Sequence, residues 1–202
     1  MTWRTYFLLS DNAVKLEALL NPNLKEHHGG MKSTANTDVD NKIINLDVSQ
    51  SPLKTALSYA YELKNLENSE KYSEINNNAK KRSITKSKYV KSIIKLEAEA
   101  IFFRCRVFRD LGAEDSDLPF KKDYLKIYDS TKELPIEEGI KQISLYIQEQ
   151  GIVRREYSAK KYYSDCYDFY AGKKLWPSFY DDQPRKETIV LNPDDINSNP
   201  KI

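Results

Sequence analysis

The chain has little of the chemistry that most catalytic sites use. Its 202 residues include two histidines, two cysteines and six glycines. The histidines, His27 and His28, are neighbours in one polar segment, so a Ser-His-Asp or Cys-His arrangement has to be built on that segment. Adjacent histidines also point in different directions, which disfavours a metal site there. The glycines form neither GxGxxG nor GxxxxGK, and nucleotide hydrolysis is therefore disfavoured.

Long apolar runs are also missing. No stretch approaches the roughly 18 consecutive apolar residues of a membrane span. The first twenty residues contain three charges from Asp11 onward and no small-residue cleavage site, so they do not predict a secretion signal. Cys105 and Cys166 lie in apolar or aromatic stretches, which is typical of reduced core thiols rather than of a disulfide framework. We therefore expect a cytoplasmic protein without membrane contact, cofactor or bound metal.

One stretch of the sequence, residues 84–111, is strongly helical and strongly apolar. At 100° per residue its apolar side chains cover a broad arc from Tyr89 to Leu111, and such a helix is normally covered from several sides. Thr85 or Ser87 can supply the N-cap, and a glycine follows the last apolar residue. The sequence predicts a mostly α fold, a single helical bundle around a long central helix (85–111), with a small β element from the N-terminal region.

Other helices are predicted where a cap or a proline precedes apolar residues at helical spacing. They cover residues 11–20, 52–66, 119–133, 136–150 and 158–171. Residues 2–9 and 42–48 are predicted as two paired strands.

The remaining segments are predicted as loops and a tail. Polar composition predicts mobile loops at 23–41 and at 67–83, where the apolar periodicity ends and three asparagines follow one another. The mainly helical domain is expected to span 1–172. Residues 173–202, rich in proline and polar side chains, are expected to form an extended C-terminal arm that is disordered at its end.

Two charged residues, Glu97 and Arg104, fall within the apolar arc of the central helix. They are seven positions apart, or about 10 Å along the helix axis. One interpretation is a partly buried structural ion pair or two side chains that reach the edge of the arc. The other interpretation is a functional polar pocket inside the helical bundle.

Charge is concentrated at the start of the same helix. Residues 75–96 carry +7 in a chain whose net charge is +2, so the remaining residues sum to −5. Cations at a helix N-terminus oppose the helix dipole, whereas a bound anion would offset them. The predicted phosphate or acidic-partner site consists of Lys80, Lys81, Arg82, Thr85, Lys86, Ser87, Lys88, Lys91 and Lys95. The alternative is that these side chains keep a loop and a helix face soluble.

Aromatic residues gather in the last predicted helix and the arm, interleaved with lysine and arginine. Tyrosine and tryptophan suit the rim of a core and also an interface, because a polar tip follows an apolar ring. Core packing, a protein-docking surface and base stacking are all compatible with this pattern. The predicted docking residues are Tyr162, Tyr163, Tyr167, Tyr170, Trp176, Phe179 and Tyr180.

These patterns favour two functions. The first is a non-enzymatic interaction protein, an adaptor or a subunit of a larger assembly, that docks on a protein partner through the tyrosine-rich helix and the arm. The alternative is a nucleic-acid-binding protein that contacts backbone phosphates through residues 80–95. Catalysis is not expected, although carboxylates from distant helices can still meet in space. The oligomeric state is left open.

Overall fold

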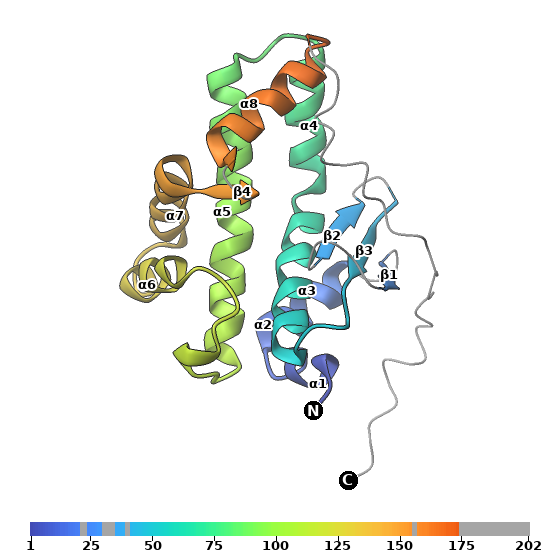
Figure 1. The fold of residues 1–202 in the computed structure, drawn as a ribbon, viewed down its shortest axis with the longest axis vertical. Helices are drawn as coiled ribbons and strands as arrows, with labels where there is room; N and C mark the ends of the chain where they lie inside the picture. Colours follow the sequence, from blue (N-terminus) through green and yellow to red (C-terminus); the bar gives the residue numbers. More distant parts are fainter. Residues whose placement is uncertain (21–23, 30–34, 39–40, 155–156, 174–202) are drawn as a thin grey trace.

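The computed structural model describes residues 1–20, 24–29, 35–38, 41–154 and 157–173. A 25-residue helix, α5 (Lys86–Asp110), runs through the middle of the fold (Figure 1). Thr85 is its N-cap, and Gly112 adopts a φ of 62° just after its end. Twelve of its residues are buried, including Tyr89 and Phe108. The central helix predicted at 85–111 is confirmed, with its ends where the local capping residues place them.

Other helices surround α5 on several sides. On one side α3 (Pro52–Glu67) and α4 (Ser69–Lys80) follow one another almost in line, and on the other lie α6 (Lys122–Thr131) and α7 (Ile136–Gln150) (Figure 1). The last helix, α8 (Ala159–Tyr170), crosses α5 and reaches α4. The mostly α bundle predicted from the sequence is therefore confirmed.

Shorter elements complete the bundle. Helices α1 (Trp3–Phe7) and α2 (Asp11–Leu20) pack against α3, and a 3-10 turn (Asp115–Asp117) follows α5. Among the described residues, no helix combines the length and the apolar character that crossing a membrane requires.

A small sheet lies against α3, as the predicted N-terminal β element requires. Its strands are β1 (Lys25–His28), β2 (Ala35–Asp38) and β3 (Ile43–Leu46), in the order β1-β3-β2. The central strand β3 is buried along its whole length, parallel to β1 and antiparallel to β2. A second pair, β4 (Ile152–Arg154) and β5 (Tyr157–Ser158), connects α7 to α8.

The strand predicted at residues 2–9 is wrong, because these residues form helix α1. Thr2 caps that helix by accepting the backbone N–H of Thr5 at 3.2 Å. The helix buries Phe7, whose ring contacts Tyr59 of α3 with a centroid distance of 5.0 Å. The aromatic composition of this segment alone favours a strand, but packing against α3 makes it helical. The strand predicted at 42–48 is present as β3, but it pairs with β1 and β2.

Both predicted loops contain regular structure. Residues 69–80 form α4, and Tyr72, Ile75 and Ala79 pack against the core at helical spacing. Three apolar positions are enough because α5 and α8 pack against α4, whose other positions are serine, charged residues and asparagine. Within 23–41, the described residues form β1 and β2, and His27 is buried rather than solvated.

Two further boundaries differ from the prediction. The helix expected at 119–133 begins only at Lys122, after the 3-10 turn. Of the predicted arm at 173–202, residues 174–202 lie outside the described residues.

Candidate functional site

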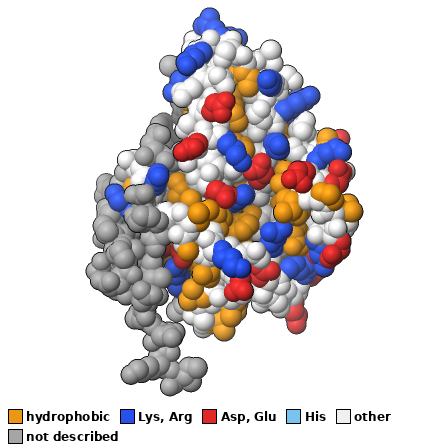
Figure 2. Space-filling view, turned by 180° about the vertical axis from the view of Figure 1, so that it is seen from behind, with side chains coloured by type: hydrophobic (Ala, Val, Ile, Leu, Met, Phe, Trp, Pro, Cys, Tyr) orange, Lys and Arg blue, Asp and Glu red, His pale blue; other side chains and the backbone are white. Residues whose placement is uncertain are grey.

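The predicted anion site folds as the end of α4, a turn and the first part of α5. Lys80 is the last residue of α4, Lys81 and Arg82 follow it, and Thr85 caps α5. All nine residues of the predicted site are exposed. Figure 2 shows lysine and arginine side chains gathered at the upper end of the molecule, with carboxylates beginning just below them. The fold thus collects these charges at one end of the bundle.

Three residues of this set hold the fold together. The hydroxyl of Thr85 accepts a backbone N–H from the first turn of α5 at 3.3 Å. Lys86 donates to Asp168 of α8 at 2.7 Å, and Arg82 donates to the backbone carbonyl of Ala171 at 3.1 Å. Thr85 thus caps α5, while Lys86 and Arg82 tie the α8 region to the start of α5, so we assign all three a structural role.

The other lysines of the set remain directed to solvent. Lys88, Lys91 and Lys95 follow a spacing of three and four residues, which places them on one side of α5. Neither they nor Lys81 has a carboxylate at ion-pair distance within the described part of the chain. Lys80 lies over the ring of Tyr170, 5.6 Å from its centroid.

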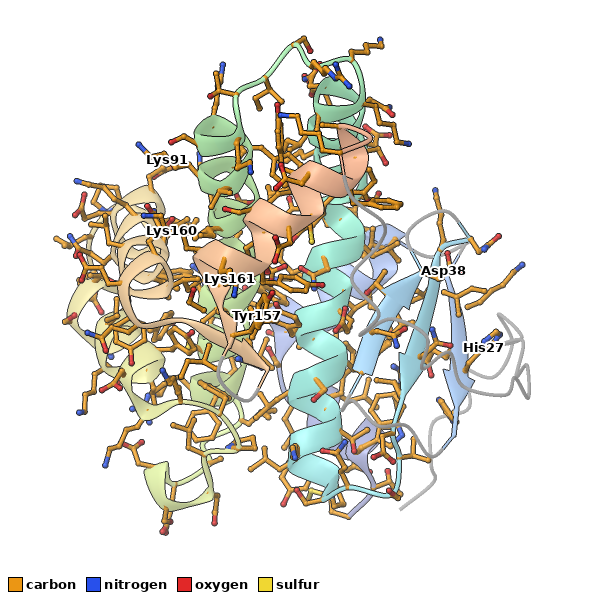
Figure 3. All side chains as sticks on the ribbon, turned by 45° about the horizontal axis from the view of Figure 1, so that its top comes forward. His27, Asp38, Lys91, Tyr157, Lys160 and Lys161 are labelled. Carbon is orange, nitrogen blue, oxygen red and sulfur yellow. The ribbon has the colours of Figure 1, made fainter. Side chains whose placement is uncertain are left out.

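Helix α8 adds two cations that the sequence pattern did not assign to this site. Lys160 and Lys161 are exposed at the start of α8, where this helix crosses α5. Figure 3 labels Lys91 beside α5 and, below it in that view, Lys160 and Lys161 at the start of α8. The Lys161 ammonium also lies over the ring of Tyr157, 4.6 Å from its centroid. We use the name basic face for Lys81, Lys88, Lys91, Lys95, Lys160 and Lys161.

The tyrosine-rich helix is mostly part of the core, and the docking surface predicted there stays a prediction. Tyr162 and Tyr167 are buried, and the Tyr167 hydroxyl donates to the backbone carbonyl of Ile84 at 3.0 Å. Tyr163 and Tyr170 are half-buried and pack against the same core. A partner therefore meets little of these rings. The remaining predicted docking residues, Trp176, Phe179 and Tyr180, lie outside the described residues.

Glu97 and Arg104 do not pair with each other in the described part of the chain. The Glu97 carboxylate accepts hydrogen bonds from the hydroxyls of Tyr61 and Tyr72. The Arg104 guanidinium stacks between two rings, 4.9 Å from the Tyr61 centroid and 4.3 Å from that of Phe120. The described residues therefore show no ion pair between them, while both side chains are half-buried, so two side chains at the edge of the arc and a polar pocket both stay open as interpretations.

That pocket is a cavity of about 350 Å³ at the centre of the bundle, here called the Arg104 cavity. Helices α3, α5, α6, α7 and α8 contribute to it, together with Ala35 of β2 and the chain at β4. Its polar lining residues are Ser58, Tyr61, Glu62, Glu97, Arg104, Tyr124 and Tyr163. The exposed side chains of Ile152 and Val153 also line it, so it opens beside β4.

The sequence analysis missed Glu62, the second carboxylate of this cavity. Glu62 is buried and accepts from the hydroxyl of Thr37 at 2.6 Å and from the side-chain amide of Asn65 at 3.2 Å. Burial, with the charge of Glu97 nearby, raises the pKa of Glu62 to about 7. The sequence did contain a signal for its burial, because Glu62 is three residues after Tyr59 and four before Leu66 and so lies on the buried face of α3.

Comparison with family models, with curated proteins and with solved structures found no match to this chain. Within the described ranges, no three histidine, cysteine, aspartate or glutamate side chains gather closely enough to hold a metal ion. The basic face and the Arg104 cavity are thus the two features that carry functional hypotheses.

Proposed function

We propose that the protein is a binding protein that contacts the phosphate backbone of nucleic acid through the basic face. The observation that supports this proposal is a group of exposed lysines, drawn from the α4–α5 turn and from the crossing helices α5 and α8, without ion-pair partners in the described chain. Such a surface has a net attraction for polyanions, and phosphate contacts carry most of the affinity of non-specific nucleic-acid binding.

The spacing of the lysines on α5 suits a linear array of charges. Lys88 and Lys95 are seven residues apart, which corresponds to about 10 Å along the helix. Phosphates of one DNA strand rise by roughly 3.4 Å per nucleotide along the duplex axis. One side of α5 therefore spans about three phosphates, and Lys160 and Lys161 extend the surface across α8.

The first hypothesis, docking through the tyrosine-rich helix, has less support after the burial of Tyr162 and Tyr167. A role as an adaptor or a subunit of a larger assembly is compatible with nucleic-acid binding and stays a prediction. The cytoplasmic location also stays a prediction.

The test is a titration of fluorescent single-stranded and duplex oligonucleotides of mixed sequence at several salt concentrations. For the wild type, log affinity should fall linearly with log salt, by roughly 0.9 per duplex phosphate contact or 0.7 per single-strand contact. Charge reversal of Lys81, Lys88 and Lys91 to glutamate should flatten the slope by about two to three units. Circular dichroism should show an unchanged fold, because all three side chains are exposed.

A second triple variant has the same change of net charge. Lys15 of α2 and Lys122 and Lys132 at the ends of α6 are exposed but lie outside the basic face. Reversal of these three should leave the slope nearly unchanged. Equal losses in both variants, or no salt-dependent binding by the wild type, would reject the proposal. Binding to poly-glutamate without binding to nucleic acid would indicate an acidic protein partner instead.

A further inference from the structure

The Arg104 cavity is a half-open pocket that brings opposite charges together, which the basic face does not. Its volume of about 350 Å³ lies within the range of small-molecule sites, roughly 300–1,000 Å³. Apolar side chains, including Ile101 and Ile147, form part of its wall. Arg104, Glu62 and Glu97 supply charges from two different helices.

Arg104 has donors in excess of acceptors. Its Nε is buried without a hydrogen-bond partner among the described residues. The rings of Tyr61 and Phe120 lie 4.9 and 4.3 Å from the guanidinium carbon and offer it cation–π contacts rather than hydrogen-bond acceptors in its own plane. A buried donor without an acceptor is unfavourable, so a ligand that accepts from it is favoured. A carboxylate that accepts two parallel N–H bonds is the group that best matches this fork.

On the acidic side of the cavity, acceptor atoms outnumber the hydrogen-bond donors. Only one oxygen of Glu62, Oε2, accepts hydrogen bonds from described residues. The pKa of Glu62 is raised to about 7 because burial and the nearby Glu97 outweigh the attraction of Arg104. An ammonium group beside Glu62 would favour the ionised carboxylate and supply the donors that Oε1 lacks.

The opposite charges of Arg104 and of Glu62 and Glu97 restrict which ligands the cavity can bind. A simple anion that reached Arg104 would be repelled by Glu97 and by ionised Glu62. A simple cation that reached Glu62 would be repelled by Arg104. A molecule with both charges satisfies both sides, and Tyr124 and Tyr163 with the aliphatic wall can cover an apolar body.

We propose that the Arg104 cavity binds a small zwitterion of the amino-acid type with an apolar or aromatic side chain. Its carboxylate accepts from Arg104, and its ammonium group donates to Glu62. Glu97 is held by Tyr61 and Tyr72 and acts on the ligand through its charge. This inference is independent of nucleic-acid binding, because the cavity and the basic face share no residue.

The experiment is isothermal titration calorimetry of the full chain with three probes of similar shape. They are L-phenylalanine, phenethylamine, which lacks the carboxylate, and 3-phenylpropionate, which lacks the ammonium group. L-Leucine and 5-aminopentanoate vary the side chain and the separation of the charges. The zwitterion that fits best should bind roughly tenfold or more tightly than either singly charged probe.

Two substitutions test the roles of the charged groups separately. Arg104→Met should weaken zwitterion binding roughly tenfold or more and strengthen phenethylamine binding. Glu62→Gln, which keeps the shape of the side chain, should weaken zwitterion binding and strengthen 3-phenylpropionate binding. Arg106→Met is the matched control, because Arg106 lies two residues away on α5 and does not line the cavity.

Three results would overturn the proposal. The first is that no zwitterionic probe binds the folded wild type, which would leave a cavity that holds water alone. The second is that singly charged probes bind as tightly as the zwitterions. The third is that Arg104→Met and Arg106→Met weaken binding equally while both variants remain folded by circular dichroism.

Discussion

Arg4 of α1 donates two hydrogen bonds to the carboxylate of Glu17 in α2, at 2.6 and 2.7 Å. Tyr59 of α3 donates a third to the same carboxylate at 2.6 Å. The Glu17 side chain is only 8% exposed, so these donors replace most of its hydration. One buried carboxylate thus joins three helices, and it explains why residues 3–7 dock as a helix on α3.

Arg4→Met should lower the free energy of unfolding by about 2–4 kcal/mol, because it leaves Glu17 buried without its cation. Urea denaturation near neutral pH measures this loss. The double variant with Glu17→Met should recover only part of it, since Glu17 then leaves no buried charge but the buried Glu26 carboxylate, 3.8 Å from Arg4 in the wild type, still lacks its cation. Lys15→Met, an exposed change on α2, should stay within about 0.5 kcal/mol of the wild type. Equal midpoints for Arg4→Met and Lys15→Met would contradict this account.

Gly139→Ala should destabilise the contact between α7 and α5. A Cβ at Gly139 would collide with the ring of Phe102 and would lie 2.8 Å from the hydroxyl of Thr131. Overpacking of this kind costs about 1–3 kcal/mol, which thermal or urea unfolding detects. Adding Phe102→Leu should recover part of the loss. Gly29→Ala meets nothing within 4 Å and should be neutral; if it is as harmful as Gly139→Ala, close packing is not the cause.

Glu62 should make the protein less stable as the pH rises from 4.5 to 7. Its pKa is raised from 4.5 to about 7, so in this window the folded state binds more protons than the unfolded state. The stabilising contribution is present below pH 4.5 and is lost through pH 7, with a total of about 3 kcal/mol. Glu62→Gln should therefore gain stability relative to the wild type across this range.

Urea unfolding at several pH values measures the difference between these two curves. Glu137→Gln, an exposed change on α7, serves as the control and should follow the wild type. Parallel curves for the wild type and Glu62→Gln would show that Glu62 does not titrate in this window.

Both cysteines should resist thiol reagents while the protein is folded. Burial is the main cause that raises the pKa of Cys105 and of Cys166 to about 12. Near pH 8 the thiolate fraction is then very small, and labelling should be at least about 100-fold slower than for a free thiol. Ser130→Cys adds an exposed thiol that should react at once. Fast labelling of two thiols in the folded wild type would contradict their burial.

Local sequence patterns determined the helices whose caps and apolar spacing agree with their packing. The central helix follows from Thr85, a broad apolar arc and Gly112, and the segment 136–150 follows from its isoleucine spacing. In these segments the hydrogen bonds and the buried face are set by residues three or four positions apart, which a sequence displays directly. The charge of residues 80–95 was equally visible, because exposed side chains need no partner.

Tertiary structure alone decided the elements and sites that depend on distant residues. Residues 3–7 and 69–80 form helices because α3, α5 and α8 cover their few apolar side chains. Lys160 joins the basic face only because α8 crosses α5. Glu62 and Arg104 come together because α3 and α5 pack side by side, although 42 positions separate them along the chain. Periodicity within one helix holds no information about that distance, so the cavity became visible only in the folded protein.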